Sequence, residues 1–517
     1  MNDHYDAISI GSGLGGLTAG ALAALDGKKV LVLERHDRFG GAASMFSRKG
    51  CSFDVGLHEL DGMDENDAKI TLVERLKIRE NLDIVPINEF FTVSHPLLGE
   101  DFSMPDNTDR ALQAMIDRFP QHEKNLRVYF STITKIRNKV SALAQKKRPL
   151  IYWILTAVTV PFRFWIVGKN EKVTLGGFLD KLFGDDEAVK IALCGNLCYF
   201  SDDPYKLSLL FFSVAQGSYL SGGCHYIKGG SGELSNYLVK IIEEAGGSAL
   251  AGRSVDRILL EDGRAAGVTH TDAGTGEDSR DVKSPLIFGN ASPLVLGKML
   301  PEEACGDFMA QYEHVPLSMS LWQLYIILDR TTESLGVPGY STFVYPQEGT
   351  PLKDVKNHLT MMGEPPTGKI PLYVIVDYGR IDSGICGDSK YVVAVCGPDH
   401  ISNWKDLSGE EYADRKAAWQ DAVIDDVDKH YPGFKKAVLH CEMATAKTMK
   451  RFLNAPDGAV YGFSQEPAHA GRFRPTSKTS VERLLLASGY AMPGGGFTGA
   501  MLAGQSAYRS AVKKKLL

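Results

Sequence analysis

The feature that most constrains the fold is a glycine-rich turn near the N-terminus, Gly11-Ser12-Gly13-Leu14-Gly15-Gly16. It follows the apolar run 7–10 and opens a helix-like run over 17–25. A second apolar run, 30–33, then leads directly into Glu34. Strand, glycine turn, helix, strand and acid in this order form the complete dinucleotide-binding fingerprint. The order predicts a parallel α/β sheet with a pyrophosphate-binding turn at one edge.

Each residue type in the fingerprint has a physical role. Gly11 permits the tight turn, Gly13 lets the backbone approach a pyrophosphate, and Gly16 allows close packing of helix against strand. The helix start offers free N–H groups and partial positive charge to the phosphates. Glu34 follows Gly16 by 18 residues and is expected to accept hydrogen bonds from the adenosine ribose hydroxyls.

Length and composition narrow the class of protein. A chain of 517 residues exceeds the size at which one core stops growing, so we expect two domains. The net charge of -6 gives no reason to expect a nucleic-acid partner. The eight cysteines show no CxxC pair and no cluster with histidine, which predicts neither a zinc site nor a disulfide framework and favours a reducing compartment. The N-terminus lacks a signal-like segment, so we expect a cytoplasmic location.

Two motifs behind Glu34 carry a family resemblance. Gly40-Gly41 follows the acid closely, and Phe53-Asp54-Val55-Gly56-Leu57-His58 comes next. Fingerprint, acid, glycine pair and Phe-Asp-x-Gly-x-His together resemble the phytoene desaturase superfamily of FAD flavoproteins. The Gly-x-His variant resembles the retinol saturase and carotenoid cis-trans isomerase branch most. The resemblance implies a Rossmann-type FAD-binding domain with a discontinuous substrate domain of antiparallel sheet plus helices, as in the amine oxidase and phytoene desaturase fold.

The resemblance also implies positions for the cofactor. The loop 40–44 would lie near the pyrophosphate and ribityl chain, residues 55–58 beside the flavin ring, and Val255 against the adenine. The full set expected to bind FAD is Gly11, Gly13, Leu14, Gly15, Gly16, Glu34, Arg35, Gly41, Ala42, Ser44, Val55, Gly56, Leu57, His58, Val255, Gly489, Gly496, Phe497 and Thr498. His58 and Glu59 are the candidate catalytic residues for proton handling. The alternative for His58 is a hydrogen bond to backbone in a strand beside the flavin. No metal is expected.

A second glycine-rich stretch lies near the C-terminus. Gly494-Gly495-Gly496 follows a strand-like run over 484–490 and precedes a helix-like run from Phe497. A helix start without side chains can approach the edge of a flat polar ring, and its dipole stabilises negative charge on a reduced flavin. The sequence departs from the family at Tyr490, where many relatives carry an acid or amide that holds the ribityl chain.

The remaining chain is divided by pattern. Residues 1–70, 225–295 and 441–517 are expected to form the FAD-binding domain, and 71–224 and 296–440 the substrate-binding domain. Residues 70–145 are helical and charged in pattern, 53–60 indicate a short strand carrying a glycine, and 171–224 indicate apolar helices. Strand-like runs within 296–440 predict an antiparallel sheet that roofs a cavity, with Tyr312, Trp322 and Tyr325 as either lining or core residues.

A basic and aromatic segment suggests contact with a membrane. Lys146-Lys147-Arg148-Pro149 leads into an apolar run that is too short to span a bilayer and is interrupted by Pro161 and Arg163. Its composition favours docking in the membrane interface over 146–168, with a buried helix as the main alternative and a true span as the least favoured. We therefore expect a cytoplasmic protein associated peripherally with a membrane.

The function expected from these features is an FAD-dependent oxidoreductase that acts on carbon–carbon double bonds of an apolar polyene or isoprenoid lipid. Saturation, desaturation and cis-trans isomerisation all need a flavin and an apolar substrate cavity, so the sequence does not distinguish them. A single fingerprint implies no resident NAD(P) domain, so electrons would come from or go to a transient partner. The alternatives are an unsaturated fatty-acid isomerase with Lys228 or Arg163 as carboxylate anchor, an amine oxidase, for which no aromatic cage is recognised, and a non-catalytic lipid carrier.

Overall fold

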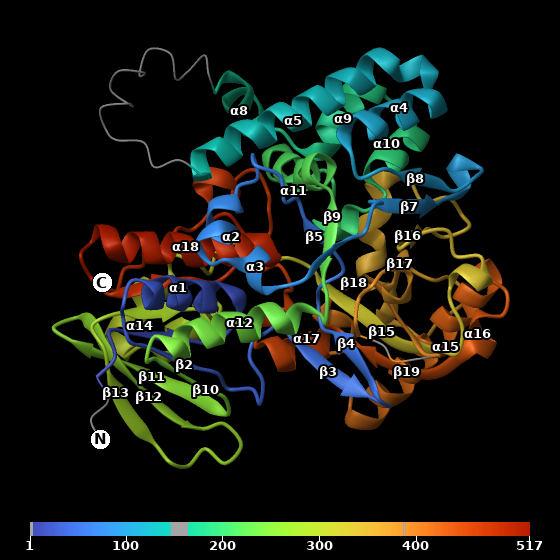
Figure 1. Cartoon of the computed structure of the whole chain (residues 1–517). Helices are drawn as coiled ribbons and strands as arrows, with labels where there is room; N and C mark the ends of the chain where they lie inside the picture. Colours follow the sequence, from blue (N-terminus) through green and yellow to red (C-terminus); the bar gives the residue numbers. More distant parts are fainter. Residues whose placement is uncertain (1–3, 146–163, 386, 388) are drawn as a thin grey trace.

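The fingerprint folds into a five-stranded sheet in the computed structural model, which describes residues 4–145, 164–385, 387 and 389–517 (Figure 1). All neighbouring strands in this sheet run parallel. The strands, in spatial order, are β10 (Ser248–Leu250), β2 (Val30–Leu33), β1 (Ala7–Ile10), β14 (Ile287–Gly289) and β20 (Leu484–Leu486). Segments from both ends of the chain therefore meet in one sheet, with β1 at its centre.

The two faces of this sheet belong to different cores. Val30 and Val32 pack into a core with the helix α1 (Leu14–Leu25). Leu31 and Leu33, which alternate with these valines along β2, pack into a second core with Val255. This period of two is what a strand buried on both faces requires. The second core is closed by a three-stranded antiparallel sheet of β11 (Arg253–Glu261), β12 (Arg264–Asp272) and β13 (Arg280–Lys283).

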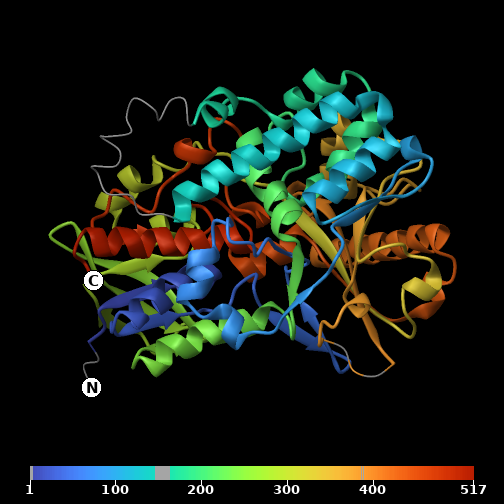
Figure 2. The ribbon, with the colours of Figure 1, turned by 45° about the horizontal axis from the view of Figure 1, so that its top comes forward.

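Two further helices accompany α1. They are α12 (Ser231–Glu244) and α18 (Phe497–Lys513), and both contact α1 directly. Figure 2 shows α18, in red, running beside the blue N-terminal segment although the two are almost the whole chain apart. The N-terminal ends of α1 and α18 are thereby brought to the same end of the parallel sheet.

A seven-stranded sheet forms the other half of the molecule (Figure 1). Its strands are antiparallel except for one parallel pair between β16 and β7. In spatial order they are β19 (Val438–Ala444), β15 (Ser320–Leu328), β18 (Tyr391–Asp399), β17 (Tyr373–Asp377), β16 (Ser341–Val344), β7 (Phe91–Ser94) and β8 (Phe102–Met104). The antiparallel sheet expected within 296–440 is confirmed, and it also takes in strands from outside that range.

The expectation of helices throughout 70–145 is wrong in the middle. Residues 84–104 contain β6 (Ile84–Pro86), β7 and β8. β7 pairs with β16 from more than two hundred residues later, and this tertiary pairing overrides the helical pattern of the neighbouring segments. The single strand expected over 53–60 is also wrong, because β4 (Cys51–Asp54), paired with β3 (Met45–Arg48), ends before the turn and β5 (Leu60–Asp61) begins after it. β5 and β6 both pair with β9 (Cys224–Ile227).

The remaining helices are divided between the two halves of the molecule. Residues 171–224 are mainly helical, as expected. The α-helices of the described chain other than α1, α12 and α18 are α2 (Ile70–Arg75), α3 (Ile78–Asn81), α4 (Thr108–Arg118), α5 (Glu123–Gln145), α8 (Trp165–Asn170), α9 (Leu175–Phe183), α10 (Glu187–Cys194), α11 (Leu209–Gly222), α13 (Pro293–Leu296), α14 (Glu302–Met309), α15 (Gly409–His430), α16 (Phe434–Ala437) and α17 (Ala446–Leu453). Of these, α13 and α14 pack into the second core of the parallel sheet, whereas α15 packs against the seven-stranded sheet. Within the described ranges, none of the helices has both the length and the apolar character that crossing a bilayer demands. Most of the proposed docking segment, 146–163, lies outside the described residues.

Candidate cofactor and substrate site

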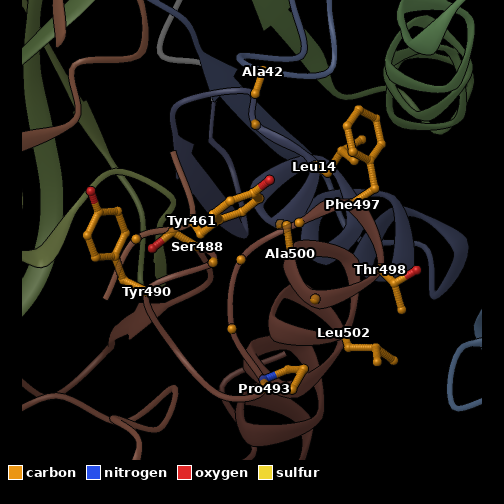
Figure 3. A pocket seen from close by; sticks show the side chains of 18 of the residues that line it. Leu14, Ala42, Tyr461, Ser488, Tyr490, Pro493, Phe497, Thr498, Ala500 and Leu502 are labelled. Carbon is orange, nitrogen blue, oxygen red and sulfur yellow. The ribbon is translucent and has the colours of Figure 1, made fainter. Parts of the chain in front are cut away.

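A cavity of about 1100 Å³ runs between the two halves of the molecule. Its lining includes Gly13 and Leu14 from the first glycine-rich turn, and Gly495 and Phe497 from the second. Figure 3 shows residues of both helix starts, Leu14 and Phe497 among them, around this one space. Both glycine-rich helix starts therefore face the same cavity.

Most residues expected at the cofactor line this cavity. They are Gly11, Gly13, Leu14, Gly15, Glu34, Arg35, Gly41, Ala42, Val55, Gly56, His58, Val255, Gly489, Gly496, Phe497 and Thr498, and the catalytic candidate Glu59 lines it as well. Three members of the expected set are placed elsewhere. Gly16 lies in the packing between α1 and β1, since a Cβ there would be 2.4 Å from Ser9 Oγ. Leu57 is buried in the core, and Ser44 lines a neighbouring smaller cavity.

The α1 and α18 helices approach one another through glycine. A Cβ on Gly504 of α18 would lie 2.1 Å from the carbonyl oxygen of Gly15, and a Cβ on Gly15 would lie 1.9 Å from the carbonyl oxygen of Ala487. Real Cβ atoms do not come so close to other atoms, so both positions require glycine, which has no side chain. This close packing is what holds the two helix starts against the same cavity.

Glu34 is fixed by hydrogen bonds from the fingerprint turn and from the residue two places after it. Its Oε2 accepts the Ser12 N–H at 2.9 Å and the Ser12 hydroxyl at 2.6 Å, and its Oε1 accepts the His36 N–H at 2.9 Å. The Ser12 hydroxyl also accepts the Gly40 N–H at 3.0 Å, which ties the fingerprint to the loop 40–44. The carboxylate of Glu34 is thereby held at the cavity wall.

Asp54 organises the turn of the Phe-Asp-x-Gly-x-His motif. Its buried carboxylate accepts the Leu57 N–H at 2.9 Å and the Gly56 N–H at 3.2 Å. It also accepts the Ser231 N–H at 2.7 Å and the Ser231 hydroxyl at 2.8 Å, at the start of α12. Residues 55–58 are therefore shaped by one acid that is bonded to a helix far along the chain. The sequence motif marked Asp54 without revealing this role.

Tyrosines from four distant elements hold the carbonyls of the same segment. Tyr378 donates its hydroxyl to Leu57 O at 2.9 Å, and Tyr340 donates to His58 O at 2.7 Å. Tyr219 donates to Glu59 O at 3.3 Å, and Tyr325 donates to Val55 O at 3.5 Å. The sequence pattern does not reveal this set; of its members it indicates only Tyr325, as a lining or core residue. For Tyr325, its place in an otherwise apolar strand was the available signal, because a buried hydroxyl requires a partner.

His58 and Glu59 both line the cavity, and burial shifts their pKa values in opposite directions. Burial lowers the pKa of His58 to about 4, so its imidazole is neutral at pH 7. Burial raises the pKa of Glu59 to about 8, which keeps this carboxyl protonated at pH 7. The Ser341 hydroxyl donates to Glu59 Oε1, whereas Glu59 Oε2 and His58 Nε2 have no hydrogen-bond partner within the described structure.

A buried charge network lies behind the second helix start. Thr498, in the first turn of α18, donates its hydroxyl to Asp61 Oδ1. Lys69 Nζ lies 3.5 Å from Asp61 and 3.1 Å from Asp67, and Arg137 lies 3.3 Å from Asp67. The start of α18 is thereby connected to the long helix α5, which was not foreseen.

The position where the sequence departs from the family is also buried. Tyr490 lines the cavity with its hydroxyl unpaired in the described structure, and its ring packs edge-on against Phe463. Arg474 beside it donates to the carbonyl oxygen of Gly489 at 3.1 Å and to that of Ala491 at 3.3 Å. The turn after β20 is therefore shaped by an arginine.

Several other candidates are not in the cavity. Tyr312 and Trp322 are core residues, and Tyr325 lines only the neighbouring smaller cavity. Lys228, considered as a carboxylate anchor, pairs with Asp382 at 2.5 Å and does not line the main cavity. The other anchor candidate, Arg163, lies outside the described residues.

Comparison with known proteins supports the resemblance. An NAD(P)-binding Rossmann-like domain matches residues 10–76. The chain is 25% identical over 497 residues to an all-trans-retinol 13,14-reductase of Macaca fascicularis, covering 93% of this chain and 80% of the reductase. It is 26% identical over 542 residues to prolycopene isomerase 1, chloroplastic, of an Oncidium hybrid cultivar, covering 99% of this chain and 85% of the isomerase. The chain is a relative of both. The resemblance to the retinol saturase and carotenoid isomerase branch is confirmed.

Solved structures support the fold class. An oxidoreductase from Methanosarcina mazei matches with a TM-score of 0.62 at 17% identity, covering 97% of this chain and 99% of that one. Cyclohexylamine oxidase from Brevibacterium oxydans matches with a TM-score of 0.58 at 16% identity, covering 99% of each chain. This relative of retinol 13,14-reductases thus has a Rossmann-type domain with an amine-oxidase-like second half, as expected.

Proposed function

We propose that this protein is an FAD-dependent oxidoreductase that acts on carbon–carbon double bonds of an apolar polyene or isoprenoid lipid. The observation that carries the proposal is the main cavity of about 1100 Å³. It runs from the fingerprint, past the second glycine-rich helix start, His58 and Glu59, into a chamber lined by Leu210, Phe211 and Val214. The named relatives, a retinol reductase and a prolycopene isomerase, support a polyene substrate.

The residues present fit FAD. A Cβ on Gly13 would lie 2.7 Å from Asn290 Nδ2, so this position at the cavity wall has no room for a side chain. Glu34 is held at the wall where a ribose hydroxyl can donate to it, and two helix starts without capping side chains can meet the pyrophosphate and the flavin ring. We propose that 1–70, 225–295 and 441–517 form the FAD-binding domain and that 71–224 and 296–440 form the substrate domain.

A bound flavin supplies or accepts a hydride at its N5, and Glu59 handles the matching proton. In saturation, one carbon of the double bond gains the hydride, its neighbour gains the Glu59 proton, and Glu59 is left ionised. Desaturation reverses both transfers. In isomerisation the hydride would return to the flavin and the proton to Glu59, so no net oxidation occurs. His58 is neutral at pH 7 and orients the substrate or Glu59 rather than donating the proton.

The mouth of the cavity suits delivery of a lipid from a membrane. Leu143 of α5, Val167 of α8 and Met492 line it, and Leu143 and Met492 are exposed. Trp165, next to this edge in α8, leaves 66% of its surface exposed. Exposed aromatic and aliphatic groups around an opening are typical of membrane contact. We propose peripheral docking of this edge on a membrane.

A second candidate is an FAD-dependent isomerase of unsaturated fatty acids. Arg509 and Lys513 of α18 line the same opening, and an ammonium or guanidinium there suits a carboxylate headgroup. An apolar chamber with a cationic mouth accepts a fatty acid as readily as a neutral polyene.

The test is to identify the bound cofactor and the substrate together. Mass spectrometry of the denatured, purified protein should find FAD. Anaerobically photoreduced protein is then mixed with all-trans-retinol, a cis-carotenoid or linoleate, and flavin reoxidation and products are followed. Conversion of a polyene supports the proposal, and conversion of linoleate alone supports the second candidate. Absence of FAD, or lipid binding without any conversion or reoxidation, overturns the enzymatic proposal in favour of a carrier.

A further inference from the structure

A second cavity, of about 510 Å³, lies beside the first and has no part in the proposed function. Residues of the N-terminal segment between 34 and 55 form one wall, and α15 and the segment from β19 through α17 form the others. Figure 1 shows α17 and β19 close to β3 and β4. Glu34, Gly41 and Val55 line both cavities, so the two share a wall.

Positive charge dominates the lining of this second cavity. Its permanently charged members are five cations, Arg38, Arg48, Lys416, Lys447 and Arg451, and two carboxylates, Glu34 and Glu442. Both carboxylates are already engaged, Glu34 by the Ser12 N–H at 2.9 Å and Glu442 by Arg48 Nε at 3.0 Å. The positive charge of the five cations is therefore larger than the negative charge of the two carboxylates that line the cavity.

Three of these cations have no acidic partner among the described residues. Lys447 Nζ lies 4.8 Å from the centre of the Tyr412 ring, and Lys416 Nζ lies 6.0 Å from the same centre. In the described part of the chain, no carboxylate pairs with either ammonium group or with Arg451. Two half-buried ammonium groups that face one ring repel each other, and the cation–π attraction offsets only part of that cost. An anion bound between them removes the repulsion.

The inner end of the same cavity is apolar. Phe46 and Tyr325 meet edge to face there, with ring centres 4.8 Å apart, and Val55, Met443 and Met449 complete the surface. The cavity thus combines a cationic outer part with an apolar inner part that ends at the wall shared with the main cavity. A ligand that fills it needs a multiply charged anionic group at one end and a ring or hydrocarbon at the other.

We propose that the second cavity binds a phosphate-bearing amphipathic ligand. Its phosphate lies among Lys416, Lys447 and Arg451, because a dianion with several acceptor oxygens satisfies three cations at once. Its apolar part lies against Phe46 and Tyr325. A reduced nicotinamide dinucleotide phosphate and an isoprenoid diphosphate both have this chemistry. The inference concerns binding alone and stands whether or not the main cavity turns over polyenes.

The test is a calorimetric titration of the full chain, kept saturated with FAD so that the main cavity does not take the probe. NADPH and farnesyl diphosphate are titrated separately at low salt into the wild type, the double variant K416Q/K447Q, and Lys450→Gln. Lys450 is the matched control because it is on α17, pairs with Asp457 at 3.8 Å and does not line the cavity. We expect the double variant to bind about tenfold more weakly or worse, and the control to bind within about twofold of the wild type.

The two probes separate the two sources of phosphate. Saturable binding of NADPH alone supports the proposal with an electron donor as ligand, and binding of farnesyl diphosphate alone supports it with the head of a lipid as ligand. Both replaced lysines are partly exposed, so an unchanged melting temperature of the double variant shows that its fold is intact. No saturable binding of either probe, or equal affinity of the double variant and the wild type, overturns the proposal. Neither result depends on polyene turnover.

Discussion

The starts of α1, α12 and α18 look alike in sequence, yet they differ in what occupies them. Each helix has a glycine as N-cap and so no capping side chain of its own. At α12, the carboxylate of Asp54 accepts the N–H and the hydroxyl of Ser231 and so fills the place of an anion. The starts of α1 and α18 face the main cavity instead.

This difference teaches that a glycine-rich helix start is not by itself a phosphate site. Any helix leaves its first N–H groups without intrahelical partners, and the protein either satisfies them internally or leaves them for a ligand. The sequence around Gly230 resembles a nucleotide turn but lacks the rest of the fingerprint. The structure adds the physical reason why it is closed: Asp54 is already there.

The same criterion separates two buried acids five residues apart. Asp54 is surrounded by donors from Gly56, Leu57 and Ser231. Glu59 has one oxygen bonded to Ser341 and, within the described structure, one oxygen with no partner. A satisfied acid fixes structure, whereas a half-satisfied acid at a cavity is available for chemistry.

The largest effect is expected from Glu59→Gln. Loss of the protonated acid next to His58 should lower the rate of double-bond conversion by about a hundredfold to ten-thousandfold, with the flavin spectrum unchanged. The wild-type rate should be level below pH 8 and fall as the pH rises through about 8, because Glu59 then loses the proton that it must donate. His58→Gln is the comparison and should retain this alkaline limb. If the rate of Glu59→Gln still falls above about pH 8 as the wild-type rate does, another group donates the proton.

Asp54→Ala should have the next largest effect, on stability. It strips several buried donors of their acceptor, so the free energy of unfolding should fall by about 3 kcal/mol, measured by urea denaturation with FAD present. Acetate should restore part of the loss in Asp54→Ala and none in the wild type, because it can take the empty carboxylate position at the start of α12. Restoration by chloride to the same extent would mean that the α12 start has no specific need of a carboxylate.

Gly15→Ala tests one of the open starts. The added Cβ would lie 1.9 Å from the carbonyl oxygen of Ala487, so α1 must move away from β20 at a cost of about 1–3 kcal/mol. FAD affinity, measured by quenching of flavin fluorescence, should fall about tenfold or more. Gly306→Ala in α14 is the control, because nothing lies within 4 Å of its added Cβ. Equal FAD affinity in Gly15→Ala and the wild type would show that the α1 start is not part of the cofactor site.

Local motifs predicted the fold well where contacts are close in sequence. The order of β1, α1, β2 and Glu34 was readable because each element has its own period and its own turn residues. β7 was not readable, because its pairing with β16 depends on a strand that lies far along the chain. Residues 55–59 were not readable as a turn, because Asp54 takes its partner from the start of α12.

The candidate site shows the same division. Motif glycines such as Gly13 and Gly496 were assigned to one cavity from sequence, and the structure places both there, although their role as FAD ligands stays a prediction. The hydroxyls of Tyr340 and Tyr378 hold the carbonyls of His58 and Leu57 from the residue before β16 and the turn after β17, which no local pattern connects to this segment. Buried hydroxyls of this kind identify their partners only in three dimensions.

The smallest effect is expected from Thr498→Val at the other open start. Thr498 is the one side chain in the first turn of α18 that bonds to the buried network, through Asp61. Valine keeps the shape and removes the hydroxyl, and Lys69 still holds Asp61, so FAD affinity should fall by no more than about fivefold, equivalent to about 1 kcal/mol. Thr498→Ser should bind FAD as the wild type does. If Thr498→Val instead loses FAD as fully as Gly15→Ala, then the α18 start works through its side chain and not through open backbone, and the likeness between α1 and α18 would not hold.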